Sequence, residues 1–516
     1  MEEIIKKILE NRGIKKKEEF FSPEISHLTD PFEIPYMKEG CDLLRKVIEK
    51  KEKVFLYADG DVDGIFSIYF IIKVLQKTGT DFLFYITHRL DSYEIEENII
   101  PYLKKENISL FISVDCGISS VNFLKEVKKE GIKVIVIDHH IFNPAFLPEG
   151  NIYINPKLYN CLPEIKFLSS TALVQKFTKG LSYSIPVEIE ENLELVAIAT
   201  IADNCPLIGE NRKIIKMGLE KIFSTEIKGL KILIDELNIG EKNLIKDLKM
   251  KLIPKLNSPG RFGKPEIILD LLLSEKVEEI IKEVKEIDRK RYKITKDCLE
   301  KIKEKIEKET FIVEKDILPS ICGILSSRLS YETNRPVAIA SEKNGMIQGS
   351  ARCPEFYNLQ KFIEKTKKYM ISSGGHQNAI GFTFKVEFLD NIKKEWENFI
   401  SNEKEEVFYY DAEIELDKIT PSFLKELSKF APFGPGNPEP VFLSRRVKVE
   451  KIIREKEGEL VFWVRKDNSI FECILKSSDE NIVPEKFIDI FYIPRYRENN
   501  GLYRIYLLVK KFNRSF

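Results

Sequence analysis

Three short apolar runs, each followed by an aspartate, dominate the pattern of hydrophobic and polar positions. They are Val54–Ala58 before Asp59, Leu110–Val114 before Asp115, and Ile132–Ile137 before Asp138. The runs are rich in β-branched and aromatic residues, and helix-length segments separate them. This pattern predicts buried parallel strands in alternating β/α units. Because ligands bind at the carboxyl ends of such strands, we expect a functional site at that edge.

Further acidic residues and two histidines accompany these runs. The first run continues as Asp59-Gly60-Asp61-Val62-Asp63-Gly64 and the third as Asp138-His139-His140. Asp203 follows the apolar segment Leu195–Ala202, which predicts a helix leading to the same face. Clustered carboxylates repel one another, so a group of aspartates with imidazole indicates bound divalent cations. Oxygen-rich ligands with one or two histidines suit Mn²⁺ or Mg²⁺ better than structural zinc.

A pair of such ions would suit hydrolysis at phosphorus. Two ions ~3.5–4 Å apart would activate a water molecule and stabilise the attacking and leaving oxygens at phosphorus. The alternative is that Asp59 or Asp115, taken singly, is a helix N-cap or turn residue. Only five histidines occur in the chain, and two stand side by side after a buried strand. Packing explains that placement poorly, so the pattern favours a metal-dependent phosphoesterase site.

The rest of the chain predicts a multidomain α/β protein. A densely charged stretch from Ser274, a candidate N-cap, to Glu309 has apolar residues at helical spacing, which predicts a long connecting helix with a solvated face. A second α/β unit follows it. The C-terminal stretch alternates in polarity and contains Asn500-Gly501, which predicts a hairpin and a small β-barrel. The predicted domains are a helical lead (1–50), the parallel-sheet domain (51–235), a linker with the long helix (236–309), the second α/β domain (310–402) and the barrel (403–516).

Composition narrows the class of protein. The 516 residues are enough for about three domains, and the 43% hydrophobic content argues against global disorder. No apolar run approaches the ~20 residues of a membrane helix, so we expect a cytoplasmic protein. The eight cysteines form no CxxC pair and are expected to be reduced thiols. The 82 basic and 82 acidic residues cancel, so binding to nucleic acid would depend on local charge.

The motifs resemble a known family. The aspartate-rich loop, Val114-Asp115-Cys116-Gly117, Asp138-His139-His140 and Thr200-Ile201-Ala202-Asp203 are similar to the four motifs of the DHH phosphoesterase superfamily. Later segments narrow the resemblance to the RecJ family of single-strand-specific 5′→3′ DNA exonucleases. These segments are Asn11-Arg12-Gly13 to Asp30-Pro31, Leu256–Arg261, Gly349–Arg352, Gly374-Gly375-His376 and Pro432–Pro438.

The resemblance implies a role for each matching residue. Asp61, Asp63, Asp115, His139 and Asp203 would hold the metal pair, with Asp59 at its rim. Asp138, His139 and His140 would be catalytic, with His140 near the scissile phosphate. Substrate-binding residues would be Arg89, Arg261, Ser350, Arg352 and His376. The arginines suit phosphate because the guanidinium group matches its oxygens, although each alone is also consistent with an ordinary solvated side chain.

The chain departs from the family pattern at a few positions. A glycine-tyrosine-glycine element expected after Arg89 is Asp91-Ser92-Tyr93-Glu94 here, and Cys353 and Ser258-Pro259 replace the usual small residues. None of these positions is a proposed metal ligand. The C-terminal barrel would be an OB fold, with Trp463, Tyr496, Tyr503 and Tyr506 as candidates for base stacking or for ordinary packing.

The resemblance also implies an activity and partners. The expected enzyme is an Mn²⁺- or Mg²⁺-dependent monomer that degrades single-stranded DNA to 5′-mononucleotides in recombination and repair. A helicase and a single-strand-binding protein would be its partners. Two alternatives stay open: a DHH enzyme acting on short oligonucleotides or cyclic dinucleotides, and a non-catalytic DNA-binding replication factor. The extra C-terminal barrel counts against the first, and the intact ligand positions count against the second.

Overall fold

The chain folds into two compact units. The computed structural model describes residues 2–88, 95–354, 356–402, 409–456, 459–476, 482–499 and 502–514. The larger unit comprises residues 28–205 and 209–406, and the smaller one comprises residues 1–27, 206–208 and 407–516. The N-terminal segment therefore belongs to the same unit as the C-terminal one. None of the helices in the described residues is long and apolar enough to cross a membrane.

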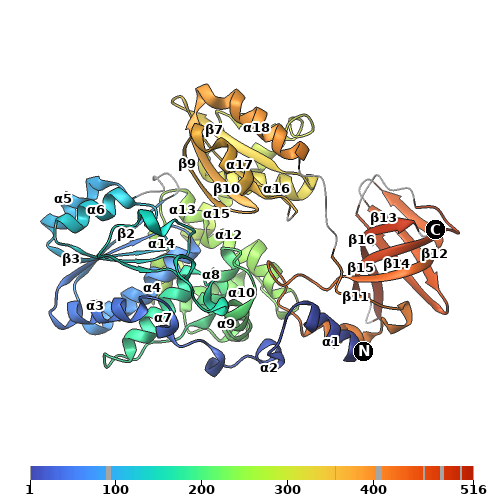
Figure 1. The fold of residues 1–516 in the computed structure, drawn as a ribbon, viewed down its shortest axis with the longest axis horizontal. Coiled ribbons are helices and arrows are strands. Elements are labelled where there is room, and N and C mark those ends of the chain that lie inside the picture. The colour runs from blue at the N-terminus through green and yellow to red at the C-terminus, as the bar shows by residue number, and fades with distance from the viewer. Residues whose placement is uncertain are drawn as a thin grey trace. The chain divides into compact units, whose positions relative to one another are not determined.

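A parallel five-stranded sheet forms the first part of the larger unit (Figure 1). Its order is β2-β1-β3-β4-β5, with β1 at Lys53–Ala58, β2 at Phe82–Ile86, β3 at Ile108–Val114, β4 at Lys133–Ile137 and β5 at Ile152–Ile154. All four pairings are parallel. The three apolar runs of the sequence are β1, β3 and β4, so the predicted parallel sheet is confirmed.

Helices cover both faces of this sheet (Figure 1). On one face lie α5 (Ile100–Lys105) and α6 (Val121–Lys129), where Phe123 packs on Phe111 of β3 with ring centroids 4.9 Å apart. The other face carries α3 (Met37–Glu49), α4 (Val62–Thr78) and α7 (Ser170–Ser182). Helix α8 (Leu193–Ala202), which the sequence predicted, packs on α4 and α7 and is buried almost throughout. It ends at Asp203.

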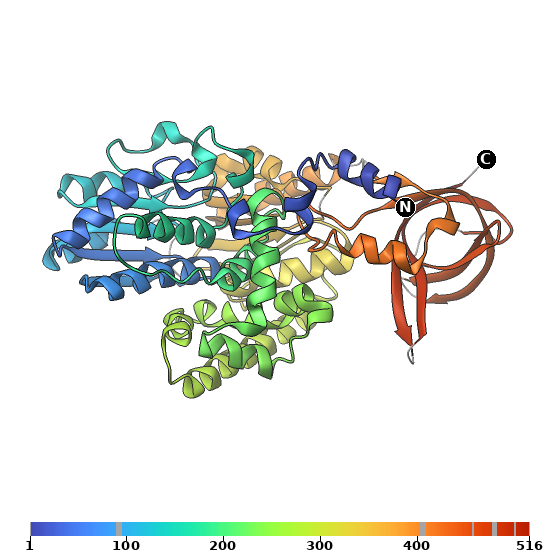
Figure 2. The same cartoon turned by 90° about the horizontal axis from the view of Figure 1, so that it is seen from below.

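A helical segment follows (Figure 2, green). Its helices are α9 (Gly209–Lys221), α10 (Lys228–Glu236), α11 (Leu244–Asp247), α12 (Ile253–Leu256), α13 (Ser258–Arg261), α14 (Glu266–Leu273) and the long α15 (Glu278–Ile302). The long helix is thus confirmed, but Ser274 as its N-cap is wrong. Ser274 ends α14, and its hydroxyl accepts a hydrogen bond from the Lys276 N–H at 3.0 Å, which forms a turn between the two helices.

The second α/β part contains a mixed sheet. Its order is β6-β7-β8-β10-β9, with β6 at Phe311–Glu314, β7 at Val337–Lys343, β8 at Met346–Arg352, β9 at Met370–His376 and β10 at Ala379–Lys385. Only the β6–β7 pairing is parallel. The helices are α16 (Pro319–Thr333), α17 (Leu359–Thr366) and α18 (Leu389–Asn402). The core is aromatic: Trp396 is buried against Phe362, and its indole N–H donates to the Thr310 hydroxyl at 3.0 Å.

The smaller unit is built on a β-barrel (Figure 2). Its strands are β11 (Ala412–Glu413), β12 (Phe442–Lys456), β13 (Glu459–Lys466), β14 (Ser469–Leu475), β15 (Phe487–Asn499) and β16 (Leu502–Arg514). The order β11-β12-β13-β14-β16-β15 closes through an additional β12–β15 pairing. The predicted barrel is therefore confirmed. The Asn500-Gly501 turn lies outside the described residues, and Asn499 and Leu502 on either side of it are paired.

The smaller unit also contains the α-helices α1 (Glu2–Asn11), α2 (Lys17–Phe21) and α19 (Pro421–Ser428). Ile8 and Leu9 of α1 belong to the same buried cluster as Phe430 and the barrel strands. Arg12 makes an ion pair with Asp411 at 2.7 Å and donates to the Asn437 side-chain oxygen at 2.8 Å. Two of the motifs at opposite ends of the chain, one around Arg12 and one around Asn437, are thus in direct contact.

Candidate metal centre

The aspartates that follow the strands lie side by side at the carboxyl edge of the parallel sheet. The ladder of backbone hydrogen bonds extends one residue past each strand. The aspartate N–H donates to the last carbonyl of the next strand at 3.4, 3.0 and 3.2 Å for Asp59, Asp115 and Asp138. The sheet itself therefore fixes the spacing of the three acids.

The loop after β1 is held tightly. Asp61 is the N-cap of α4, and its carboxylate accepts hydrogen bonds from the N–H groups of Asp63 and Gly64 at 2.9 and 3.3 Å. The hydroxyl of Thr87 donates to Asp59 at 2.9 Å. A Cβ on Gly64 would lie 2.2 Å from the Asp59 carbonyl oxygen, so this position requires glycine. Within this loop, Asp61 has the capping role that the sequence left open for Asp59.

The start of helix α7 supports two of the acids. The backbone N–H groups of Ser170 and Thr171 donate to the buried Asp63 carboxylate at 2.9 and 2.8 Å. The Ser170 hydroxyl donates to Asp115 at 2.9 Å. Free N–H groups at a helix N-terminus favour negative charge. The sequence analysis did not identify Ser170 or Thr171; a Ser-Ser-Thr run before an apolar helix signals a cap but not its acidic partner.

His139 is the point where the acids converge. Its Nε2 atom lies 3.4 Å from Asp115, 3.8 Å from Asp63 and 3.6 Å from Asp203, measured to a carboxylate oxygen of each. These separations exceed a normal hydrogen bond of ~2.7–3.2 Å. They remain below the ~4.2 Å that separates two ligands on opposite sides of one ion at ~2.1 Å. The four side chains thus have the spacing of ligands around a shared cation.

A second group of donors adjoins the first. Carboxylate oxygens of Asp59, Asp61 and Asp115 all lie within 4.8 Å of one another. Asp115 belongs to both groups, which is the arrangement expected of a carboxylate between two ions. The structure therefore brings together all six residues predicted as metal ligands, with Asp59 inside the second group of donors.

The electrostatics of the cluster favour a bound cation. Burial, and then the charge of Asp203, raises the pKa of Asp63 to about 7. Burial and the charge of Asp61 likewise raise the pKa of Asp203 to about 6. Burial and Asp63 raise the pKa of Asp115 well above its ordinary value. Burial lowers the pKa of His139, which keeps the imidazole neutral and able to bind a metal. Five carboxylates and one neutral imidazole fit Mn²⁺ or Mg²⁺.

Asp138 occupies a different position from the other acids. It is fully buried, and its carboxylate accepts hydrogen bonds from the N–H groups of Ile118, His139 and His140 at 3.2, 2.7 and 3.0 Å. The same carboxylate lies 2.8 Å from His140 Nδ1. Burial lowers the pKa of His140, but the facing Asp138 outweighs it and raises that pKa to about 9. Asp138 therefore orients a half-exposed, positively charged His140.

Two cysteines lie beside the acids. The Cys205 thiol donates to Asp203 at 3.2 Å, and the Cys116 thiol donates to the Val114 carbonyl at 3.4 Å. Burial, and then Asp203 for Cys205 and Asp59 for Cys116, raises the pKa of both thiols well above the ordinary value. Cys205 lies close enough to His139 and Asp203 to be a further donor, but Mn²⁺ and Mg²⁺ prefer oxygen and imidazole donors to thiolate. All eight cysteines are free thiols in the structure.

The segment Leu256–Arg261 packs against the aspartate-rich loop. The Asn257 side-chain oxygen accepts a hydrogen bond from the Val62 N–H at 3.1 Å. A Cβ on Gly260 would lie 2.2 Å from the Gly60 carbonyl oxygen, so the two backbones meet there. Ser258, one of the departures from the family pattern, is buried and donates to Asp288 of α15 at 3.0 Å. Asn257 is a supporting residue that the sequence analysis did not identify.

The proposed substrate-binding residues belong mainly to the second sheet. Ser350 and Arg352 share one face of β8, and the guanidinium group donates to the Ser350 hydroxyl at 2.5 Å. Arg352 and His376 both stand opposite Ala379 of β10, one on each side. Arg261 donates a short hydrogen bond to the Ser320 carbonyl at the start of α16. The structure thus groups Ser350, Arg352 and His376 at one sheet end; Arg89 lies outside the described residues.

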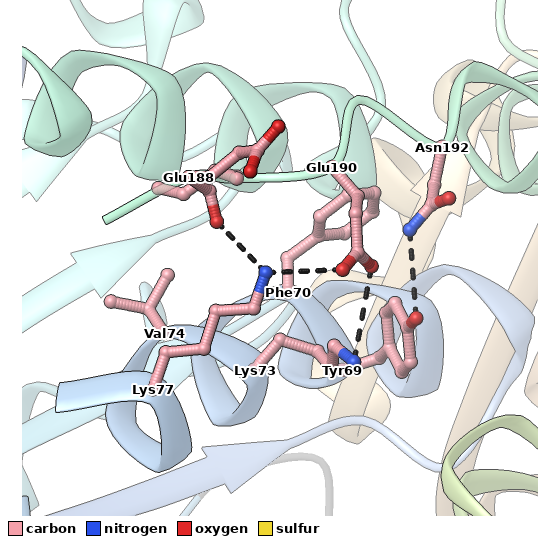
Figure 3. Close-up of a pocket in the computed structure, with 9 residues that line it drawn as sticks. Tyr69, Phe70, Lys73, Val74, Lys77, Glu188, Glu190 and Asn192 are labelled. Atoms are coloured by element: carbon pink, nitrogen blue, oxygen red, sulfur yellow. Dashed lines mark hydrogen bonds and ion pairs between the residues drawn. The ribbon is translucent and has the colours of Figure 1, made fainter. Parts of the chain in front are cut away.

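A separate, small pocket lies beside α4, between this helix and the chain that leads into α8 (Figure 3). Lys77 donates to the Glu188 carbonyl at 2.8 Å and to the Glu190 carboxylate at 3.0 Å. The Asn192 side chain reaches the Tyr69 hydroxyl at 3.5 Å. These contacts fasten the chain before α8, and α8 carries Asp203 at its far end.

The parallel sheet, the paired donor groups at its carboxyl edge and the Asp-His-His turn define a phosphoesterase of the DHH class. The family model for the DHH family, N-terminal domain, matches residues 53–200; the DHHA1 domain matches 305–402 and the RecJ OB domain matches 410–511. The chain belongs to the RecJ family. It is 30% identical over 534 residues to the single-stranded-DNA-specific exonuclease RecJ of Bacillus subtilis (strain 168) and covers 67% of that protein with 98% of its own length.

Other RecJ proteins are also similar to this chain. The RecJ of Thermus thermophilus is 27% identical, over 84% of this chain and 64% of the relative. The crystal structure of a Thermus thermophilus RecJ in complex with Mn²⁺ has a TM-score of 0.80 and 22% identity, and covers 99% of this chain and 76% of that one. A structure of exonuclease RecJ bound to manganese has a TM-score of 0.59 and 24% identity, over 72% and 95%. The chain thus spans about two thirds of the two curated relatives.

Proposed function

We propose that this protein is a metal-dependent exonuclease that hydrolyses single-stranded DNA from the 5′ end and releases 5′-mononucleotides. The observation that carries the proposal is the convergence of Asp63, Asp115 and Asp203 on His139 Nε2. Membership of the RecJ family supports the substrate and the reaction. Manganese and magnesium complexes of RecJ, together with the donor set, support Mn²⁺ or Mg²⁺ as the cofactor.

Each group of residues in the site has its own proposed role. Asp59, Asp61, Asp63, Asp115, His139 and Asp203 would hold two cations, which supply the charge that brings a water molecule and the phosphodiester together. Asp138 holds His140 in a charged state, so its imidazolium can donate a hydrogen bond to a phosphate oxygen. Ser350, Arg352 and His376 supply hydrogen-bond donors for the 5′ end of the strand. Arg261 and Arg89 are proposed as further phosphate contacts.

The barrel of the smaller unit supports a single-strand substrate. Its strand order is that of a closed five-stranded OB fold, in which the second and third strands bind oligonucleotides. Trp463 lies on β13, the second strand of the barrel. The Lys451 ammonium is 4.9 Å and the Arg504 guanidinium 5.4 Å from its ring centroid. A half-exposed ring with two cations close to it suits a base and its flanking phosphates.

The activity implies partners and a setting. An enzyme that acts only on single strands requires another protein to open the duplex, so we infer a helicase and a single-strand-binding protein as partners in recombination and repair. The protein would act as a monomer in the cytoplasm, where its substrate is found and where its eight free thiols stay reduced.

Digestion of labelled oligonucleotides tests the proposal. A 3′-labelled single-stranded DNA, a 5′-labelled copy and an RNA copy are incubated with Mn²⁺, with Asp115→Asn as the inactive control. We expect progressive shortening of the 3′-labelled strand and early mononucleotide release from the 5′-labelled strand. Cleavage confined to short oligonucleotides or cyclic dinucleotides would instead identify a small-substrate enzyme. Binding of DNA without cleavage by any metal would identify a non-catalytic factor.

A further inference from the structure

Lys157 lies at the same sheet edge as the metal centre, in a segment that none of the sequence motifs includes. It stands three residues beyond β5, the strand next to β4. Ile154 pairs with Ile137, and the Ile154 carbonyl accepts a hydrogen bond from the Asp138 N–H at 3.2 Å. The chain that leaves β5 therefore emerges beside the Asp138-His139-His140 turn.

The backbone of Lys157 is fastened to that turn. Asn155 is fully buried, and its side-chain amide donates to the His140 carbonyl at 2.9 Å. The Asn155 side-chain oxygen accepts the Lys157 N–H at 2.9 Å. Pro156 between them is also buried. One buried asparagine thus joins Lys157 to His140, which fixes where the lysine side chain begins.

The ammonium group of Lys157 is available for a ligand. Lys157 is half-buried, and across the part of the chain that the structure describes its ammonium group makes no hydrogen bond and no ion pair. The backbone of Lys157 is held beside His140 through Asn155, so its side chain starts from the sheet edge that carries the metal centre.

The charges that face Lys157 explain what it would bind. They are the cationic His140 and the carboxylate of Asp203, both of which have partners of their own. Two divalent cations would offset four of the five negative charges of the proposed carboxylate ligands, so a cationic side chain at the rim of the site would still help to hold an anion there. An unpaired lysine at its rim then has a phosphate oxygen as its natural partner.

We propose that Lys157 is a phosphate-binding residue of the metal centre, and that its ammonium group contacts the phosphodiester being hydrolysed. The inference rests on the proposed function, because it assigns a further contact for the same substrate. Lys157 would neutralise charge that develops on the phosphate in the transition state. The alternative role, balancing the charge of the acidic ligands alone, would change metal binding and leave the interaction with DNA unaltered.

The test compares Lys157→Gln, Lys157→Arg and the control Lys105→Gln. Lys105 is an exposed lysine that ends α5, ahead of β3, so it lies at the opposite edge of the sheet. The measurement is kcat/KM for a single-stranded oligonucleotide with saturating Mn²⁺, over a series of KCl concentrations. The Mn²⁺-induced rise in the thermal midpoint is measured for each variant in parallel.

We expect Lys157→Gln to lower kcat/KM by about 10- to 100-fold, the effect of losing one charge-assisted hydrogen bond. The slope of log(kcat/KM) against log[KCl] should become shallower by about 0.7, as expected for one phosphate contact on a single strand. Lys157→Arg should restore the slope and most of the rate. The Mn²⁺-induced thermal shift should stay at the wild-type value.

Two results would overturn the inference: a Lys157→Gln variant with the rate and salt slope of Lys105→Gln, or a loss of rate that follows a loss of Mn²⁺ binding while the slope is unchanged. Failure of the proposed function looks different. If the wild-type enzyme leaves long DNA intact and cleaves a 5′-phosphorylated dinucleotide, single-stranded DNA is the wrong substrate. The same comparison of variants on the dinucleotide then decides the role of Lys157.

Discussion

The side-chain oxygen of Asn257 accepts the backbone N–H of Val62 at 3.1 Å and so joins the helical segment to the loop that presents three of the proposed metal ligands. Val62 is the first residue of α4, directly after Asp61. Asn257 thereby satisfies one of the free N–H groups at the helix N-terminus. Close to this bond, Gly60 and Gly260 bring the two backbones into contact.

Replacing Asn257 tests this support. We expect Asn257→Ala to lower kcat by about tenfold and to cost about 1–2 kcal/mol of stability, because the Val62 N–H loses its partner in a partly buried place. The Mn²⁺ concentration for half-maximal rate should rise. The control is Asn122→Ala on the exposed face of α6. A variant with wild-type Mn²⁺ dependence would show that the loop keeps its shape without Asn257.

Metal binding should offset the repulsion between the buried carboxylates of the site. The buried carboxylates of Asp63 and Asp115 have raised pKa values, through burial and the charges of the neighbouring acids, so the metal-free protein is destabilised at neutral pH. Adding Mn²⁺ at about 100 times its Kd should stabilise the wild-type protein by about 2.7 kcal/mol, measured by thermal unfolding with and without EDTA. Asp115→Asn should abolish the shift and make the metal-free protein more stable than the metal-free wild type.

The matched control for this experiment is Asp81→Asn. Asp81 is an exposed aspartate just before β2, at the amino edge of the sheet. It should keep the full Mn²⁺ shift. An equal shift in Asp115→Asn would mean that Asp115 is not a ligand.

Asp138 should behave as a positioning residue. Its carboxylate accepts the N–H groups of Ile118, His139 and His140 and faces the His140 ring. An asparagine offers one acceptor oxygen and turns an amide donor toward these donors. Asp138→Asn should therefore lose about 1–3 kcal/mol of stability and about 100-fold in kcat. The Mn²⁺-induced thermal shift should persist, in contrast to Asp115→Asn, and its loss would place Asp138 among the ligands.

The sequence was sufficient to predict the sheet and its acids because both are local features. A short apolar run predicts a buried strand, and parallel strands end at a common edge. Asp59, Asp115 and Asp138 could therefore be placed together from the positions of the three runs alone. Helix α8 was predicted for the same reason, from its continuous apolar segment ending at Asp203.

The supporting contacts could not be predicted, because they join residues that are far apart in the chain. Ser170 and Thr171 hold Asp63 across more than one hundred residues, and Arg12 pairs with Asp411 across 399. The spacing of hydrophobic residues along the sequence does not indicate which distant residues form such pairs. The start of the long helix was missed for a related reason: Ser274 is a good cap by type, but its hydroxyl accepts a hydrogen bond in the preceding turn.

Asp288 gives a prediction about acid stability. Burial raises the pKa of this carboxyl group, but Arg291 and Lys255 outweigh burial and hold it below the usual value of 3.8. A lowered carboxyl pKa stabilises the folded state above pH 3.8, and this contribution is lost as the pH falls through the folded-state pKa. Asp288→Asn should therefore lower stability near pH 7, and the difference from the wild type should shrink as the pH falls below 3.8.

Urea unfolding of both proteins across this pH range measures the difference. Asp297→Asn is the control, because Asp297 is exposed on the same helix. A pH-independent difference for Asp288→Asn would mean that the lost stability comes from the Ser258 hydrogen bond rather than from the ion pairs with Arg291 and Lys255.

Trp463 tests the role of the barrel. The ring stands opposite Glu472 of β14 and lies close to the cationic groups of Lys451 and Arg504, so positive charge is near for the phosphates of a stacked base. Trp463→Ala should weaken binding of a long single strand by about tenfold, within the ~1–3 kcal/mol of one stacked base. Trp463→Phe keeps an aromatic ring and should lose little of the affinity for a long single strand. Fluorescence anisotropy with labelled DNA measures both variants. Cleavage of a dinucleotide, which offers no further bases for the barrel to bind, should be unaffected by either change. Wild-type binding of long DNA by Trp463→Ala would assign the ring to packing instead.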